Sequence, residues 1–231
     1  VLATAGAAVG LGNIWSFPYL AAEYGGGIFL LTYLLLVFSA GFVLVLTESA
    51  LGRMTGSGVL CAYEKISRKL SFAGYLTFIT PLIIFSFYSV VGGWVMFYAL
   101  QFIFGNGSLL ADSGYFSAFT AEPVIPAVFT LIFIALTAWI VLRGVRRGIE
   151  KTTRLLMPVL LVMLVVLAAY CICMPGGLDG LWYFFYPDFS KFSAELVLAA
   201  LGQMFFTLMI GSGVIMTYGS YLSKSENLVK S

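Results

Sequence analysis

Residues 6–18 combine three glycines and one amide inside an apolar stretch of the chain. Gly6, Gly10 and Gly12 fall within seven residues, and each glycine costs about 1 kcal/mol relative to alanine in a helix interior. Asn13 follows at once and places an amide at the depth of a membrane. Lipid tolerates a broken backbone only where it is buried in protein or lines a water-filled cavity. The break therefore predicts a binding site.

A second apolar run is interrupted in the same way. Near its middle it contains Gly202, Gly211, Ser212 and Gly213. Two interrupted helices in one bundle are a sequence pointer to the binding site of a secondary transporter. At an unwound centre, free amide groups favour a carboxylate, and free carbonyl oxygens suit a hard cation. The predicted chemistry is therefore binding of a carboxylate and of a hard cation.

The elements that carry these breaks are predicted to be membrane helices. The 231 residues are 61% hydrophobic and only 10% charged, which is typical of a polytopic membrane protein. At 1.5 Å per residue, each apolar run is long enough to cross a hydrocarbon core about 30 Å thick. We predict an all-α fold in one transmembrane domain over 1–231, with helices at about 1–22, 27–52, 73–104, 124–142, 148–174 and 195–222.

The distribution of basic residues predicts the orientation. Of twelve Lys and Arg, four follow the second helix and two follow the sixth. Five lie between the fourth and fifth apolar runs, at 143–154, and two of these fall within the first turns of the fifth helix. Only Lys191 lies on the other side. The positive-inside rule makes the basic side cytoplasmic, so both the start of the chain and the tail after the sixth helix face the cytoplasm of a cell membrane. We expect cytoplasmic loops at 54–70, with a short amphipathic helix within 59–69, and at 143–147. Outer loops are expected at 105–123 and 175–193.

Several function classes are disfavoured. The chain has no histidine, and its three cysteines form no framework, which argues against a zinc site or a His-dependent triad. The carboxylates are unclustered and no nucleophile–base pair is apparent, so we expect no enzyme. A basic stripe with exposed aromatics is missing, so we expect no nucleic-acid partner.

The chain begins in an apolar run and ends in a polar one, as a fragment of a longer protein would. The alternatives are a truncated, transport-inactive scaffold and, less favoured, a membrane-embedded enzyme.

Four stretches of the chain resemble the neurotransmitter:sodium symporter family, in the order and at the spacings of that family: 6–24, 48–53, 143–150 and 203–221. The resemblance implies a LeuT-like inverted-repeat fold of about twelve helices. This chain would hold helices 1–6, with helices 1 and 6 discontinuous and helix 1 broken around Val9–Gly12. It also implies a sodium-coupled symporter that imports an amino acid across the cytoplasmic membrane by alternating access, with Na⁺ as the coupling ion.

The resemblance assigns ligands for sodium. One ion would lie among the Ala8 carbonyl, the Asn13 side chain, and the carbonyl and hydroxyl of Thr207. Carbonyls of Gly6 and Val9 would face a second ion, whose other ligands lie on a helix beyond this chain. Two alternatives stay open: Asn13 as an amide that bonds a neighbouring helix, and Thr207 as a hydroxyl that bonds back to its own helix.

The resemblance also assigns a substrate site. Tyr88 matches the tyrosine that holds the substrate carboxylate, and Phe206 matches the aromatic lid. Ala7 discriminates most between substrate classes. Family members that carry decarboxylated amines have aspartate at this position, so alanine favours an amino acid as the substrate. The remaining positions in this site are Ala8, Gly10, Leu11, Gly12, Ile84, Thr207, Met209 and Ser212. The identity of the amino acid is left open.

Supporting positions surround this site. Glu48 is the one carboxylate well inside the membrane, where such residues are functional by default. The resemblance makes it a brace for the unwound segments, and snorkelling toward Arg53 is the alternative. Gln203 and Tyr221 match gating positions. Ser16 stands where the family often has an arginine, which puts the usual arginine–aspartate outer latch in doubt.

Two further features follow from the resemblance. Gly148 and Pro158 reproduce a glycine-x9-proline spacing that unwinds helix 5 in the family. Tyr33, Gln203 and Thr207 match chloride-site positions, but the deciding residue lies on helix 7, so chloride dependence is left open. A lipid bilayer and a small-molecule substrate are the expected partners, and the choice between monomer and dimer is open.

Overall fold

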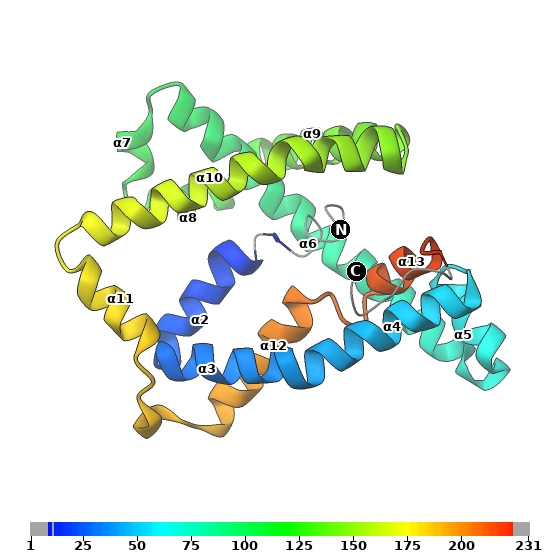
Figure 1. The fold of residues 1–231 in the computed structure, drawn as a ribbon. Helices are drawn as coiled ribbons and strands as arrows, with labels where there is room; N and C mark the ends of the chain where they lie inside the picture. Colours follow the sequence, from blue (N-terminus) through cyan, green and yellow to red (C-terminus); the bar gives the residue numbers. More distant parts are fainter. Residues whose placement is uncertain (1–8, 11, 224–231) are drawn as a thin grey trace. The chain divides into compact units, whose positions relative to one another are not determined.

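Helices make up the regular structure of residues 9–10 and 12–223, the part of the chain that this computed structural model describes (Figure 1). The first half contains the π-helix η1 (Gly12–Ser16), α2 (Phe17–Glu23), α3 (Gly27–Leu36), the π-helix η2 (Val37–Gly41), α4 (Phe42–Thr55), α5 (Val59–Ile66), the 3₁₀ helix η3 (Arg68–Leu70) and α6 (Ser71–Ile103). The second half contains α7 (Gly107–Leu110), α8 (Tyr115–Ala121), α9 (Val124–Leu142), the π-helix η4 (Val145–Glu150), α10 (Lys151–Cys173), α11 (Gly177–Phe185), the 3₁₀ helix η5 (Phe189–Lys191), α12 (Ala194–Thr207) and α13 (Val214–Ser220).

Four helical segments among the described residues are long and apolar enough to cross a membrane: Gly27–Thr55, Arg68–Ile103, Val124–Leu142 and Gly148–Cys173. The apolar run at 195–222 is not among them, because residues 208–213 separate α12 from α13. The run at 1–22 is described only from residue 9, and its α-helical part begins at Phe17. The predicted all-α fold with an interrupted sixth helix is confirmed.

The segments expected as outer loops, 105–123 and 175–193, contain short helices of their own. α7 and α8 lie in the first, and α11 and η5 lie in the second. Gly176 precedes α11 in the left-handed conformation, with φ of 81°. Elements of three to nine residues are too short to show a reliable hydrophobic period, so the sequence indicated only the loops around them.

Contacts group the chain into two compact units, which are described separately: residues 1–78 with 153–231, and residues 79–152. The single membrane domain over 1–231 stays a prediction. In the second unit, α6 and α9 approach closely, since a Cβ on Gly93 would lie 2.6 Å from the Thr130 amide nitrogen. Phe97 stacks on Phe119 of α8 with ring centroids 4.4 Å apart and meets Phe129 of α9 edge-on.

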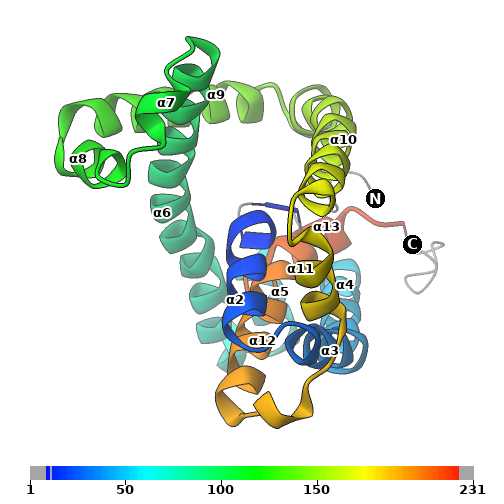
Figure 2. The same cartoon turned by 90° about the vertical axis from the view of Figure 1, so that its left-hand side faces the viewer.

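The core of the first unit lies where α2, α3 and α12 meet. Ile28 and Phe29 of α3 and Leu196 and Ala200 of α12 are buried there together with Ala21 of α2. The three helices lie side by side in Figure 1 and in the turned view of Figure 2. This packing joins α2 and α3 to α12, the helix that ends just before the interruption at residues 208–213.

The segment 175–193, which we predict to be an outer loop, packs over the turn between α2 and α3. Gly26, with φ of 61°, pairs with Pro187 in an isolated antiparallel bridge. The Tyr183 hydroxyl donates to the Ala22 carbonyl at 2.9 Å. A side chain at Gly26 would place its Cβ 2.2 Å from the Tyr183 carbonyl oxygen, so glycine is required both for the turn and for the contact.

α13 packs against α4 through small residues. A Cβ on Gly52 would lie 1.9 Å from the Met216 carbonyl oxygen, and one on Gly219 would lie 2.5 Å from that of Ser49. Without a hydrophobic driving force between helices in lipid, such close approach supplies much of the attraction. α13, the helix that follows the interruption, is thus held against α4 by close contact between the two backbones.

Gly52→Ala is expected to destabilise the protein by roughly 1–3 kcal/mol, because the new methyl group meets backbone and forces α4 and α13 apart. The measurement is the thermal unfolding midpoint of the full-length protein in detergent. Gly180→Ala in α11 is the matched control, since a Cβ there meets nothing within 4 Å. Equal midpoints for the two variants would contradict this packing.

Candidate functional site

The break between α12 and α13 is a defined turn. The Met209 amide donates to the Phe206 carbonyl at 3.2 Å, and the Ile210 amide donates to the Phe205 carbonyl at 3.1 Å. The Ser212 hydroxyl donates to the Met209 carbonyl at 2.6 Å. Met209 has φ of 53°, a left-handed conformation that few non-glycine residues adopt. Gly211 and Gly213 follow with φ of 78° and 72°, so these residues turn the backbone out of the helical pattern.

The beginning of the described chain carries the other break. Val9 and Gly10 form a bend, and the Asn13 and Ile14 amides donate to the Gly10 carbonyl at 3.0 and 3.3 Å. The π-helix η1 then leads into α2. A π-turn is a common form of local adjustment at functional sites in helices.

Five residues join the two breaks in a hydrogen-bonded group, which we call the polar clasp: Gly12, Asn13, Ser16, Gln203 and Thr207. The Thr207 hydroxyl donates to Asn13 Oδ1 at 2.9 Å. Gln203 Nε2 donates to the Gly12 carbonyl and to Thr207 Oγ1, both at 3.3 Å. The Ser16 hydroxyl donates to Gln203 Oε1 at 3.2 Å. Gln203 is only 4% exposed, so the clasp satisfies an amide that would otherwise be costly to bury.

Thr207 differs from three other threonines on the described helices. Threonine hydroxyls commonly bond back to the carbonyl four residues earlier, as those of Thr32, Thr137 and Thr217 do. Thr207 instead directs its proton across to Asn13. The structure thus brings together two of the residues predicted to bind sodium. Thr207 does not take the back-bonded alternative, whereas Asn13 makes the contact to a neighbouring helix that was its alternative. Sodium binding by either residue stays a prediction.

Phe206 and Gly12, both predicted to bind substrate, also come together. A Cβ on Gly12 would lie 1.9 Å from Phe206 Cε1, so the aromatic ring lies directly on the glycine. Any larger residue at position 12 would displace the ring. The glycine is therefore needed both for the broken backbone and for the seat of the predicted lid.

Glu48 reaches the second break. Its Oε1 accepts a hydrogen bond from the Gly211 amide at 2.7 Å, and its Oε2 is buried with no hydrogen-bond partner among the described residues. This contact satisfies an amide that the break frees from helical bonding. The bracing role that the resemblance implied for Glu48 stays a prediction.

Some predicted site residues are outside the described part of the chain, and others belong to the second unit. Gly6, Ala7, Ala8 and Leu11 lie outside the described residues. Ile84 and Tyr88 lie on α6 in the second unit, where Tyr88 packs edge-on against Phe87 with centroids 6.0 Å apart. Their place in the substrate site stays a prediction.

Other predicted residues have structural contacts. The Tyr33 ring packs edge-on against Phe17, with centroids 5.0 Å apart. Tyr221 is 77% exposed at the end of α13. Gly148 lies against the Ile140 carbonyl, and Pro158 lies within a continuous α10. A helix can accommodate the one backbone bond that a proline removes by bending. The predicted unwinding of helix 5 stays a prediction.

Sequence reasoning missed two features of the site. The left-handed Met209 had no signal of its own, although the glycines at 211 and 213 mark the turn in which it lies. Ser16 was noted only for the arginine it replaces, whereas its hydroxyl is part of the polar clasp. The conformation of Met209 depends on the turn around it, and the Ser16 contact depends on the fold.

Comparison with known proteins decides the family. The family model described as "Sodium:neurotransmitter symporter family" matches residues 1–107 and 124–231. The chain belongs to this family.

Relatives and a solved structure agree with this family. An uncharacterised sodium-dependent transporter of Bacillus subtilis (strain 168) is 36% identical over 236 residues, which cover 100% of this chain and 52% of the relative. Human sodium- and chloride-dependent GABA transporter 2 is 28% identical, with 98% of this chain and 44% of the relative covered. The crystal structure of MhsT in complex with L-phenylalanine matches with a TM-score of 0.88 at 40% identity, over 98% of this chain and 53% of that one. The chain spans about half the length of the curated relatives it matches.

Thr207→Val keeps the shape of the side chain but removes the hydroxyl that joins Thr207 to Asn13. Loss of this partly buried hydrogen bond is expected to cost roughly 1–3 kcal/mol. The unfolding midpoint of the full-length protein should fall, and the upward shift caused by added sodium should shrink. Thr137→Val is the control, because that hydroxyl bonds only within its own helix. A sodium-dependent shift as large in Thr207→Val as in the control would argue against the clasp as an ion site.

Proposed function

We propose that this chain is the amino-terminal half of a sodium-coupled symporter that imports an amino acid by alternating access. The observation that carries the proposal is the 2.9 Å hydrogen bond between Thr207 and Asn13, which links the two broken helices. Family membership supports sodium coupling. The amino acid bound to MhsT, to which this chain is similar, supports the substrate class.

In this proposal a sodium ion binds beside the polar clasp. Asn13 Oδ1 and Thr207 Oγ1 are uncharged oxygens, and they would be joined by the carbonyls of Thr207 and Ala8. Oxygen ligands of this kind suit a hard cation. The Thr207 hydroxyl, which now donates its proton to Asn13 Oδ1, would rotate away, so that both oxygens face the ion. A second ion would take carbonyls from Gly6 and Val9 and complete its shell in the remaining half of the protein.

The substrate would lie next to the ion. Its carboxylate would meet Tyr88 and the amide groups at the broken backbone, and Phe206 would cover it. Met209 and Ser212 would shape the pocket for the side chain, together with Ile84 and Ala7. Because Ala7 offers no charge for an ammonium group, the proposal favours an amino acid over a decarboxylated amine.

Alternating access would use the two breaks as joints. Glu48 holds the Gly211 amide, so order at the break can be transmitted to α4. The basic loops would face the cytoplasm, and the inward movement of sodium would drive uptake. Each positive charge contributes about 2.3 kcal/mol per 100 mV, which corresponds to a concentration ratio of about fiftyfold.

Full-length protein in proteoliposomes is expected to accumulate an amino acid only under an inward sodium gradient. The measurement is uptake of radiolabelled amino acids, screened one at a time, with an inside-negative potential. Potassium in place of sodium outside is the control and should abolish accumulation. Equal uptake in the two media would rule out sodium coupling.

Ala7→Asp is expected to weaken amino acid binding by more than tenfold, because it places a negative charge in the proposed pocket of a substrate that itself carries a carboxylate. Ala7→Asn has nearly the same size without the charge and is the matched control. The measurement is equilibrium binding of the transported amino acid at fixed sodium concentration. If the aspartate and asparagine variants bound equally well, position 7 would not lie in the substrate pocket.

A further inference from the structure

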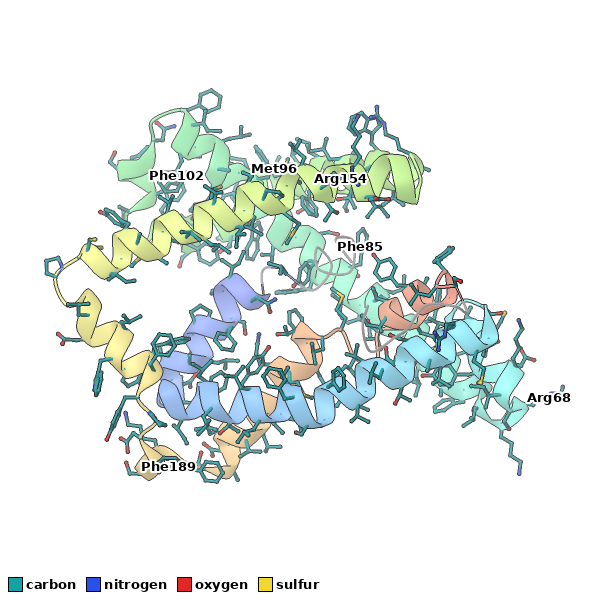
Figure 3. The ribbon with its side chains drawn as sticks, in the orientation of Figure 1. Arg68, Phe85, Met96, Phe102, Arg154 and Phe189 are labelled. Atoms are coloured by element: carbon teal, nitrogen blue, oxygen red, sulfur yellow. The ribbon has the colours of Figure 1, made fainter. Side chains whose placement is uncertain are left out.

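A basic surface with apolar edges joins two of the membrane-spanning segments. We call it the basic corner and define it by Lys65, Ile66, Arg68, Lys69, Leu70 and Phe72. It lies after the span Gly27–Thr55 and at the start of the span Arg68–Ile103. All six side chains are exposed, and those of Leu70 and Phe72 are 44% and 71% exposed. Figure 3 shows Arg68 at the edge of its unit, extending away from the ribbon, at the end opposite to Phe189.

Local hydrogen bonds give the basic corner a definite shape. Ser67 is extended, and its hydroxyl accepts from the Lys69 amide at 3.4 Å. The Ser71 hydroxyl donates to the Arg68 carbonyl at 2.8 Å. These two contacts close the 3₁₀ turn between α5 and α6. Arg68 and Lys69 are therefore presented from a formed turn, side by side.

Close contacts fix which side of α5 faces the protein. Ala62 is completely buried, and Cβ atoms built on Gly74 and Gly213 would lie 3.2 Å from the Leu60 carbonyl oxygen and 2.3 Å from Val59 Cγ2. The side of α5 that carries Val59 and Ala62 thus packs against the rest of the unit. The exposed side chains around the corner lie away from these contacts and have room for another molecule.

The charge of this surface is positive. Residues 64–69 contain three cations, Lys65, Arg68 and Lys69, against one carboxylate, Glu64. The Lys65 ammonium is held by the Thr55 carbonyl and the Ser57 hydroxyl. Within the part of the chain that the structure describes, neither the Arg68 guanidinium nor the Lys69 ammonium has a hydrogen-bond or carboxylate partner. Two adjacent cations are therefore available to an external anion.

We propose that the basic corner binds the headgroups of anionic phospholipids at the membrane surface. Cations next to a membrane span attract anionic lipids, and exposed apolar side chains beside them bury into the boundary between headgroups and acyl chains. Leu70 and Phe72 supply the apolar part, and Arg68 and Lys69 supply the charge. A zwitterionic headgroup offers no net charge to match, so the surface selects lipids by charge.

The position of the corner connects this lipid to the moving parts of the transporter. Val59 of α5 lies on Gly213, the residue that precedes α13 after the break. A lipid bound at the basic corner stabilises the position of α5, and the contact of Val59 with Gly213 extends this stabilisation to the break before α13. Anionic lipid is therefore expected to stabilise the folded protein as a whole.

The experiment compares phosphatidylglycerol with phosphatidylcholine. Each lipid is titrated into full-length protein in neutral detergent, and the unfolding midpoint is followed. Phosphatidylglycerol should raise the midpoint more than phosphatidylcholine does, and 1 M salt should remove the difference, because the screening length falls to about 3 Å. The double variant Arg68→Gln with Lys69→Gln should need about thirtyfold more phosphatidylglycerol for half of the shift, roughly fivefold for each lost charge.

Lys191→Gln is the control, since it removes a cation from the outer segment 175–193 and should leave the titration unchanged. Native mass spectrometry provides a second readout as the number of phosphatidylglycerol molecules retained by each variant. An equal response to the two lipids, an unchanged titration in the double variant, or the same shift with soluble glycerol phosphate would overturn the proposal. These measurements use neither sodium nor an amino acid, so their failure is distinct from failure of the proposed transport.

Discussion

A helix broken inside a membrane leaves amides and carbonyls that lipid cannot solvate, and each such group costs several kcal/mol if it stays unpaired. The structure meets this constraint by pairing groups at both breaks with side chains. Gln203 donates to the Gly12 carbonyl, Ser212 donates to the Met209 carbonyl, and Glu48 accepts from the Gly211 amide. At these two breaks, polar side chains lie where the backbone leaves groups to be paired.

Close approach is the second requirement, and glycine supplies it. Gly12 gives Phe206 its seat, Gly52 lets α13 reach α4, and Gly213 accepts Val59 from α5. In each case a methyl group would collide with its neighbour. Glycine weakens a helix, but it also lets the parts of a broken helix pack against their neighbours, because a larger side chain would keep them apart.

The sequence predicted the features that depend on local composition. Glycines at 10, 12, 211 and 213 located both breaks, and the resemblance selected Asn13 and Thr207, which the structure joins. It did not predict the left-handed Met209, because that conformation is imposed by the turn around it. Nor did it predict the contact of Ser16 with Gln203, which are 187 residues apart and meet only through the fold. Short helices such as α7 escaped prediction because four residues show no period.

The polar clasp contains no formal charge, since glycine, asparagine, serine, glutamine and threonine are all neutral. Glu48 is bonded to Gly211 and is not part of it. Neutral dipoles can solvate a desolvated cation only partly, and an unbalanced ion in a low-dielectric site is costly. Under the proposed function the missing negative charge is that of the substrate carboxylate. Each ligand then lowers the cost of binding the other, and by thermodynamic reciprocity the coupling acts equally in both directions. A neutral clasp is therefore a physical basis for making the uptake of one solute depend on the other.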